Sequence, residues 1–405
     1  MKAHRIGCAV ALLTSACTAG GVSDRAVTVR DSAGVQIVEN PGDDATLPVW
    51  ILEGPRVAIG VMDGDSVYQL DDVANAMLSG DRIVVVNAGT RQLRFYDLDG
   101  RHVRTVGRQG AGPGEFEDPG WMAPHRGDSI AVYDYRHRRI SVLDREGNFG
   151  RSLTPEFSFG TLAGWLADET YVVRPGSSFS SADNLESGVE RPPIGVLRVS
   201  REGEVLDTLG AYPGTEYVVD VRPGQGFSVR PRPFGLSTQV AAGDSLIYVG
   251  TSDAWVINVF DTAGALRRSI RRATQPPPIT SDVIERYTAA QLAANTDENR
   301  RRESERFYAT LEYPERMPAY SALRVDHTGN LWVQDYVVSR EDSLRWTVFD
   351  PSGRILSRLA MPPRMVVYEI GPDFVLGRVQ DDLDVQQVVL FGLSRGPATG
   401  AAGGD

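Results

Sequence analysis

The chain is short of cysteine and has no long hydrophobic run, and each shortage excludes a class of protein. Among its 405 residues the only cysteines are Cys8 and Cys17. If Cys8 leaves with a signal peptide, one thiol remains and the mature chain can form no internal disulfide. The apolar run Ile6–Leu13 is far shorter than the ~20 residues that a membrane-spanning helix needs. The sequence therefore predicts neither a disulfide scaffold nor a permanent transmembrane helix at this end.

Histidine is also scarce, which bears on catalysis. Beyond the first residues the chain has His102, His125, His137 and His327, and their spacing is not that of metal ligands. No G-x-S-x-G motif is present, and no cysteine is left for a nucleophile. We therefore predict no catalytic residues and no metal ligands, and an enzyme is the less favoured interpretation.

Positive charge is in deficit. The chain has 53 acidic against 42 basic side chains and a formal net charge of −11. Phosphate backbones are held by clustered positive charge, so this balance excludes a general nucleic-acid partner. Short basic runs such as Arg136–Arg139 and Arg300–Arg302 are interpreted as solvated faces.

The N-terminus has the pattern of an export signal. Basic residues at positions 2, 4 and 5 precede Ile6–Leu13, and the small residues of LTSAC end at Cys17. This pattern is typical of a cleaved signal peptide. The segment before Cys17 resembles a bacterial lipobox, in which cleavage leaves a lipidated cysteine at the new N-terminus. The alternative is an ordinary signal peptide whose cleavage site contains a cysteine.

The resemblance implies a location and boundaries. Residues 1–16 are predicted to be the signal peptide, and 17–26 a lipidated linker beginning at Cys17. Thr18 follows in place of aspartate, which by resemblance to Gram-negative sorting favours the outer membrane, on either its periplasmic or its surface face. The predicted membrane partner is thus reached through the lipid alone.

An internal repeat dominates the rest of the chain. Each of five segments has a short strand, a polar turn, a second strand, a D-x-x-G-like turn and a third strand, as in RQLRFYDLDG, RRISVLDREG, GVLRVSREG, WVINVFDTAG and RWTVFDPSG. Apolar alternation bounded by Gly, Asp and Asn is a strand and hairpin signal. The turn glycines recur at intervals of about 50 residues, the size of a four-stranded propeller blade. We predict an all-β, six-bladed β-propeller over 27–393, followed by a disordered tail at 394–405.

The sixth blade is predicted to be shared between the chain ends. Residues 366–393 supply up to three strands without a closing D-x-x-G turn, and that turn occurs at Asp31–Gly34, before VQIVE at 35–39. We therefore expect the N-terminal strand of 27–39 to close the last blade, removing its exposed edges. Residues 40–70 are expected to run along the outside.

One insertion interrupts the repeat between blades 4 and 5. Residues 275–318 begin with three prolines and continue with alanine, glutamate and arginine, which favour helices. Two helices are predicted, with Val283, Ile284, Tyr287 and Leu292 on one face. They are expected either to shape a binding site or to cover apolar rims of the propeller.

The segment VNAGTRQLRFYDLDGRHVRTVGRQGAGPGEFEDPGWMA at 86–123 resembles an NHL repeat, and the whole chain resembles bacterial six-bladed propeller lipoproteins. Shared features are the DSAGVQIVEN opening, the GPGEF loop and an insertion before a D-x-x-G-x-L-W-V strand at 326–333. The resemblance implies the fold and an envelope location, without an agreed activity. The glycine-rich loop 107–116 is interpreted as an inter-blade connection with Phe116 in the core, because no helix follows it to bind a phosphate.

Two functions remain open from the sequence. The first is an envelope-tethered scaffold that binds a protein or glycan partner through one propeller face, with Trp121, Tyr135, Arg136 and His137 as the candidate binding cluster. The alternative is a calcium-dependent, lactonase-like hydrolase with its site at the central channel, for which calcium would be the cofactor.

Overall fold

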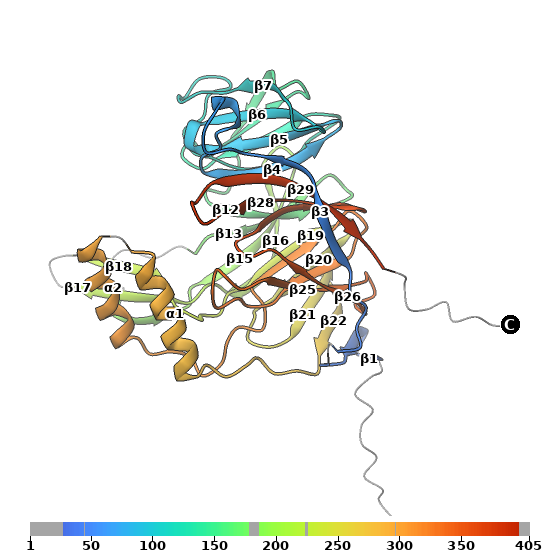
Figure 1. Ribbon diagram of the computed structural model, residues 1–405. Coiled ribbons are helices and arrows are strands. Elements are labelled where there is room, and N and C mark those ends of the chain that lie inside the picture. Colours follow the sequence, from blue (N-terminus) through green and yellow to red (C-terminus); the bar gives the residue numbers. More distant parts are fainter. Residues whose placement is uncertain (1–26, 44, 178–185, 223–225, 296, 397–405) are drawn as a thin grey trace, which may run out of the picture.

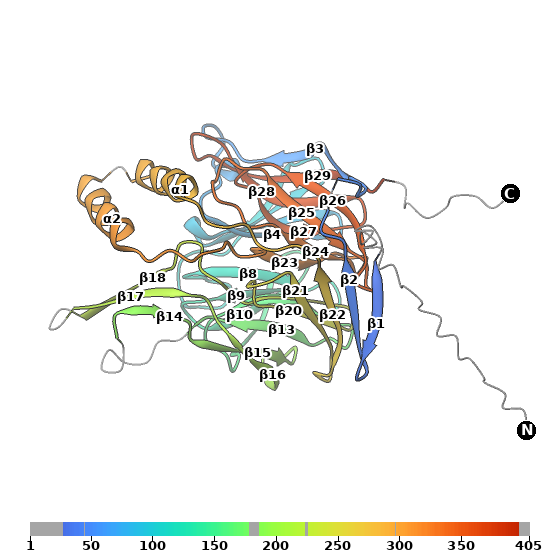
Figure 2. The same ribbon diagram turned by 90° about the horizontal axis from the view of Figure 1, so that it is seen from below.

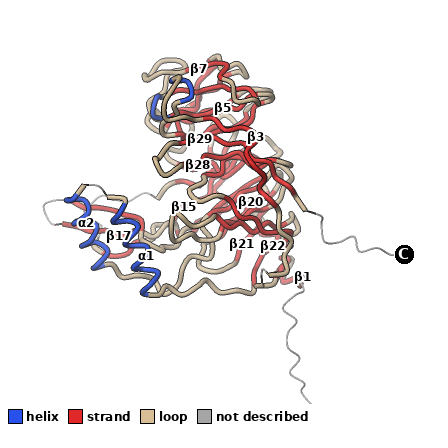
Figure 3. Tube along the Cα trace, in the orientation of Figure 1, coloured by secondary structure: helices blue, strands red, loops and turns tan. Residues whose placement is uncertain are grey.

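The computed structural model describes residues 27–43, 45–177, 186–222, 226–295 and 297–396 (Figure 1). The predicted signal peptide, Cys17 and residues 397–405 of the predicted tail lie outside the described residues. The tail is predicted to begin at residue 394, but Ser394 ends β29 (Gln386–Ser394) and Arg395 forms an ion pair with Asp326. Strands dominate, and two helices lie together at one side of the molecule (Figure 3).

Within the described ranges, six sets of four antiparallel strands follow one another along the chain. Sheet 1 is β4 (Val73–Ser79), β5 (Arg82–Asn87), β6 (Gln92–Asp97) and β7 (His102–Val106), and sheet 2 is β8 (Pro119–Pro124), β9 (Ile130–Asp134), β10 (Arg139–Leu143) and β11 (Phe149–Leu153). Sheet 3 is β12 (Gly160–Trp165), β13 (Tyr171–Pro175), β15 (Pro193–Val199) and β16 (Val205–Pro213), and sheet 4 is β19 (Gln239–Gly243), β20 (Leu246–Gly250), β21 (Val256–Asp261) and β22 (Leu266–Arg272). Sheet 5 is β23 (Ala322–Val325), β24 (Leu331–Gln334), β25 (Leu344–Phe349) and β26 (Ile355–Met361), and sheet 6 is β27 (Val366–Ile370), β28 (Phe374–Gln380), β29 (Gln386–Ser394) and β3 (Ile51–Ile59). Short 3-10 turns at Ser66–Tyr68 and Ala88–Thr90 join some of them.

The repeated D-x-x-G turns join the third and fourth strands of these sheets. In the first, the Asp97 carboxylate accepts hydrogen bonds from the amides of Asp99 (3.0 Å) and Arg101 (2.8 Å), and Gly100 has φ 79°. The aspartate side chain thus holds the turn while glycine adopts the left-handed conformation that other residues avoid. Because the turn is built from five consecutive residues, its sequence pattern predicts it reliably.

Hydrophobic clusters connect each sheet to the next and sheet 6 back to sheet 1. One cluster joins Val57 of β3 and Leu376 of β28 to Ile83 of β5, and five others join sheets 1 and 2, 2 and 3, 3 and 4, 4 and 5, and 5 and 6. Phe116, predicted to be in the core, is fully buried between sheets 1 and 2. The core is therefore a series of face-to-face sheet contacts, as in a propeller-like arrangement.

The prediction for residues 27–39 is wrong. Strand β2 (Val35–Asn40) pairs in parallel with β22 at the outer edge of sheet 4, and β1 (Thr28–Ser32) pairs with β2. The strand that pairs with β29 is β3, within the segment expected to run outside, with Val388 opposite Ile59 and Val389 opposite Ala58. An N-terminal strand does complete the C-terminal sheet, but it is a later strand than predicted.

A lobe projects from the side of the sheets (Figures 1 and 2). It contains a three-stranded sheet of β14 (Gly188–Glu190), β17 (Tyr217–Arg222) and β18 (Gly226–Pro231), and the helices α1 (Ser281–Ala293) and α2 (Glu298–Thr310). Both helices lie in the segment predicted to be helical, whereas the sequence analysis did not foresee the small sheet. β1 and the end of β29 lie on the side of the molecule opposite α1 and α2 (Figure 2).

Candidate functional sites

A central cavity of about 870 Å³ is lined by the first strands of all six sheets. Its walls come from β4, β8, β12, the end of β19, β23 and β27, with Tyr135 and Arg201 from neighbouring turns. This volume is in the range of small-molecule sites. A cavity reached by the first strand of every sheet is the natural position for a ligand that contacts several sheets at once.

Small residues allow the first strands to approach one another. A Cβ atom on Gly164 of β12 would lie 1.8 Å from the Ala242 carbonyl oxygen of β19, and one on Gly120 of β8 would lie 2.0 Å from the Tyr135 ring. The first strands are therefore rich in glycine and alanine, as in GTLAGW (160–165) and QVAAG (239–243). Such segments lack strong β signals, which explains why the sequence analysis found only three of the four strands in each of the five repeats.

Most charged side chains that line the cavity are paired. His327 Nε2 lies 3.1 Å from Glu369 Oε1, and the other carboxylate oxygen accepts the amide of Leu78 at 2.7 Å. The hydrogen bond to Glu369 raises the pKa of His327 above its usual value. Arg201 forms an ion pair with Glu169 at 2.9 Å.

Asp326 is bound at the mouth of the cavity by several donors. Its carboxylate is fully buried and accepts from the Trp332 indole at 2.8 Å and from Arg395 at 2.9 Å. Burial raises the pKa of Asp326, but these bonds and those from Asn330 and Thr328 outweigh it, so the net pKa lies below the usual value. Asp326 therefore stays ionised and holds the turn after β23.

Arg324 differs from these residues. It lies on β23, lines the cavity, is only partly exposed, and forms no hydrogen bond or ion pair with the described residues. Burial lowers the pKa of its guanidinium, and the one titratable side chain that acts against this effect is Tyr368. The phenol of Tyr368 is neutral at physiological pH because burial raises its pKa to about 12. Among the residues that the structure describes, Arg324 thus has no counter-charge.

Unpaired ring nitrogens lie on the side of the cavity formed by sheets 2 and 3. Trp121, Trp165 and His125 line the cavity, and the Nε1 atoms of both tryptophans and Nε2 of His125 lack a hydrogen-bond partner. Burial and the nearby Arg201 lower the pKa of His125, so its imidazole is neutral at pH 7. These three nitrogens are buried atoms in the wall of the cavity, not donors exposed to it.

The structure divides the predicted binding cluster. Trp121 and Tyr135 line the cavity, and Trp121 also stacks on Tyr133 at 5.3 Å, in the cluster between sheets 2 and 3. Arg136 and His137 lie outside the cavity lining, on the turn after β9, where Arg136 is exposed.

His137 has a structural partner in this turn. Its Nδ1 lies 3.2 Å from the buried Asp134, whose carboxylate also accepts the amides of His137 (2.9 Å) and Glu117 (2.8 Å). These bonds hold the loop before β8 against the turn after β9.

Arg324, which the sequence analysis did not single out, reaches the cavity instead.

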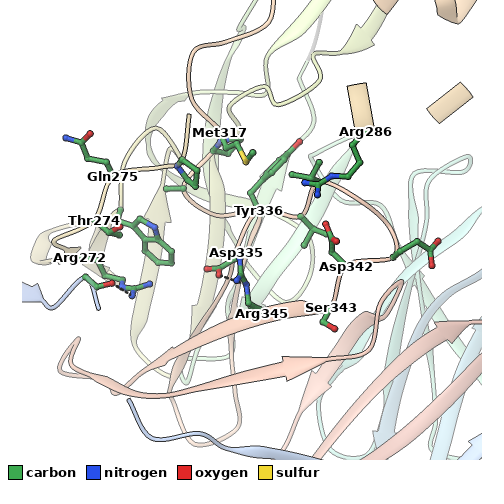
Figure 4. A pocket seen from close by; sticks show the side chains of 18 residues that line it. Arg272, Thr274, Gln275, Arg286, Met317, Asp335, Tyr336, Asp342, Ser343 and Arg345 are labelled. Carbon is green, nitrogen blue, oxygen red and sulfur yellow. Dashed lines mark hydrogen bonds and ion pairs between the residues drawn. The ribbon is translucent and has the colours of Figure 1, made fainter. Parts of the chain in front are cut away.

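A second pocket, of about 680 Å³, lies between sheets 4 and 5 beneath the lobe (Figure 4). Its charged lining includes Arg272, Arg286, Arg345, Asp335, Asp342 and Glu341, and its apolar lining includes Pro277, Met317, Pro318 and Val337. Figure 4 shows Arg286, from α1, on the same side of the pocket as Tyr336 and Asp342. Helix α1 thus contributes Arg286 to the wall of this pocket.

Some charges of this pocket are engaged and others are available. Arg345 Nε lies 3.3 Å from Asp335, and the Arg272 guanidinium lies 4.7 Å over the ring of Trp255, which is only 7% exposed. Arg286 is exposed and forms no hydrogen bond or ion pair with the described residues. The pocket therefore presents both signs of charge next to apolar surface.

Phe234 joins the lobe to sheet 5. Its ring is fully buried, with centroids 4.8 Å from Tyr287 of α1 and 6.1 Å from both Tyr313 and Tyr336. Tyr336 belongs to the loop after β24 that lines the second pocket. The aromatic cluster of Phe234, Tyr287, Tyr313 and Tyr336 therefore fixes α1 relative to the pocket.

Metal binding receives no support from the part of the chain that the structure describes. Over these residues, no group of three or more His, Cys, Asp or Glu side chains is placed to hold a metal ion. Calcium prefers about six oxygen ligands, and three of the carboxylates that line the cavity, those of Glu169, Asp326 and Glu369, are engaged by arginine, histidine or indole donors. The calcium-dependent alternative stays a prediction without a favouring observation.

No helix of the described residues is long and apolar enough to cross a membrane.

No known family profile and no curated protein matches the chain. Solved structures similar to it include a protein of Bacteroides fragilis described as exported, with 12% identity and a TM-score of 0.46 over 87% of this chain and 100% of that one. Another is a DUF4221 family member from Bacteroides vulgatus, with 11% identity and a TM-score of 0.49 over 85% of this chain and 98% of that one. A third is apo AztD from Citrobacter koseri, with 13% identity and a TM-score of 0.37 over 85% of this chain and 97% of that one. At these identities and TM-scores we draw no functional conclusion from them.

Proposed function

We propose that this protein is an exported, lipid-anchored six-bladed β-propeller that binds a polypeptide partner in the pocket between sheets 4 and 5. One observation carries the binding proposal: a pocket that combines apolar surface with the unengaged charge of Arg286 and has helix α1 in its wall. The six inter-sheet clusters, including the one from sheet 6 to sheet 1, support closure of the propeller by β3. The NHL-like repeat and the LTSAC segment support the lipoprotein class.

A polypeptide fits this pocket better than a glycan does. Glycan sites commonly use an open aromatic face, but Trp255 is buried and covered by Arg272. Arginines and carboxylates next to Pro318 and Met317 instead suit a segment that carries both charges and apolar side chains. Partner association would then depend on salt, because charge pairs at an exposed rim are screened.

The position of the chain ends supports an orientation. The described chain begins near β1, on the side opposite α1 and α2 (Figure 2). A lipid at Cys17 would therefore hold that side towards the outer membrane and leave the lobe directed away from it. Cys17→Ala is expected to remove fatty-acid labelling and release the protein into the soluble fraction; labelling that persists would overturn the anchor without affecting the binding proposal.

Photo-crosslinking in cells tests the partner. The chain has one lysine, Lys2, in the predicted signal peptide, so amine-reactive reagents are unsuitable. Benzoylphenylalanine replacing Ser343, an exposed residue of the pocket, is expected to form a discrete protein adduct. The same group replacing exposed Asp99 in a turn of sheet 1 is the matched control and is expected to form none.

Charge reversal sharpens this test. Arg286→Glu is expected to reduce the adduct at position 343 at least severalfold, because it removes the unengaged cation of the pocket wall. Identical adducts at both positions, no adduct at position 343 across growth conditions, or an adduct removed by glycosidases would each contradict a polypeptide partner in this pocket.

A further inference from the structure

We propose that the central cavity is a binding site for a small organic anion, with Arg324 as the residue that binds its carboxylate or other oxyanion. This site is separate from the pocket between sheets 4 and 5, and nothing in the proposal depends on a polypeptide partner.

The first argument is the lack of compensation at Arg324. Besides two tyrosines, Tyr135 and Tyr368, the cavity is lined by eight titratable side chains, namely His125, Glu169, Arg201, Asp244, Arg324, Asp326, His327 and Glu369. Of the charged ones, Arg324 and Asp244 form no ion pair within the described residues, and Asp244 is exposed in the turn after β19. A guanidinium that is removed from bulk water without a partner is costly. A bound anion would remove that cost.

The second argument is the position of Arg324 on its strand. Its neighbour Leu323 is 5% exposed and packs in the cluster between sheets 4 and 5, while Arg324 lies in the cavity lining. β23 pairs with β24, where Arg324 is opposite Trp332, which is fully buried. The strand is therefore held by its core side chains, and the arginine has little freedom to move to the outer surface.

The third argument is the character of the remaining wall. Apolar side chains from different sheets, including Met77, Met122, Leu162 and Val366, line the cavity together with Trp121 and Trp165. Both indole nitrogens are themselves buried, so this wall combines the Arg324 guanidinium with apolar surface. An amphipathic anion, with an oxyanion at the guanidinium and an apolar body against these side chains, uses both features.

The geometry of arginine favours planar oxyanions. Guanidinium can donate two parallel hydrogen bonds to a carboxylate, an arrangement that a lysine cannot reproduce. The overall charge of −11 repels anions in general, so anion binding in this protein requires a local cation. Binding is therefore expected to be lost when that single side chain is changed.

Calorimetric titration of the full-length protein in detergent tests the site. Benzoate is the carboxylate probe and benzamide its neutral analogue, while inorganic phosphate and sulfate test whether an oxyanion alone suffices. We expect benzoate to bind at least tenfold more tightly than benzamide. Phosphate or sulfate binding as tight as that of benzoate would identify the ligand as an inorganic oxyanion and overturn the organic-anion assignment.

Variants separate a binding role from a structural one. Arg324→Gln is expected to weaken benzoate binding at least tenfold, whereas Arg101→Gln, which removes the same charge from an exposed turn of sheet 1 outside the cavity lining, leaves it unchanged. Without ligand, Arg324→Gln is expected to raise the melting temperature, because it removes an uncompensated buried charge. Wild-type protein that binds none of the probes, or an Arg324→Gln variant that melts lower than wild type and binds benzoate normally, would overturn the proposal.

Discussion

Gly164 tests the close approach of the first strands around the cavity. It has φ 150°, and a Cβ atom there would lie 1.8 Å from the oxygen and 2.7 Å from the carbon of the Ala242 carbonyl. Both obstructing atoms belong to the backbone of β19, so no side-chain rotation can relieve the clash. Gly164→Ala therefore forces sheets 3 and 4 apart and places a side chain in a conformation that only glycine adopts readily.

The cost can be estimated from its two parts. A non-glycine residue in such a backbone conformation costs roughly 1–3 kcal/mol, and overpacking of a tight contact costs roughly 1–3 kcal/mol more. We expect a loss of about 2–6 kcal/mol in the free energy of unfolding. For a domain of this size each kcal/mol lowers the melting temperature by about 2 °C.

Thermal and urea unfolding followed by circular dichroism provide the measurement. Gly54→Ala is the matched control, because nothing lies within 4 Å of a Cβ at that position on β3, and its stability is expected to stay within about 0.5 kcal/mol of wild type. A Gly164→Ala protein as stable as the Gly54→Ala protein would refute the close contact between β12 and β19.

Two further predictions concern the lobe and the cavity mouth. Phe234→Ala is expected to remove about 3–5 kcal/mol of local packing, because its buried ring contacts three tyrosines. Trypsin should then cleave α2 at Arg300–Arg302 much faster while the sheets melt nearly as before; unchanged cleavage would contradict the anchoring role. In the cavity lining, Glu369 raises the pKa of His327 in the folded state. The ion pair between them therefore stabilises the fold fully below the unfolded pKa of ~6.5, and this stabilisation is lost as pH rises through the folded pKa. The stability difference between wild type and His327→Gln should therefore be largest near pH 5.5, at most about 1 kcal/mol for a half-exposed pair, and should vanish by pH 9; a difference that grows with pH would contradict it.

The closing strand shows why one sequence prediction failed. β3 reads ILEGPRVAI, and the adjacent Gly54 and Pro55 are a turn signal. In the structure, Pro55 lies opposite Phe391 where the register between β3 and β29 shifts, so the missing amide hydrogen is tolerated on an edge strand. VQIVE has better β character, but it pairs with β22, and local alternation carries no information about the partner strand.

The candidate sites show the same division. Trp121 was singled out because an aromatic residue next to the glycine-rich loop is conspicuous in the sequence, and it does line the cavity. Arg324 sits in SALRVD, a sequence typical of an ordinary amphipathic strand. Whether a counter-charge pairs with Arg324 depends on side chains of β27 and of the turn after β23, and the strand sequence alone does not reveal them.

By itself the sequence determined the features that arise within a few consecutive residues. These are the aspartate-bridged turns, the strands before and after them, the two helices after the proline run, and the deficits of cysteine, histidine and positive charge. Only the tertiary structure decided which strand completes sheet 6, how closely the glycine-rich first strands approach, and which arginine of the cavity lacks a partner among the described residues. The physical reason is that a turn is stabilised by its own atoms, whereas strand pairing, cavity shape and charge compensation are properties of residues that are distant in the chain and meet only on folding.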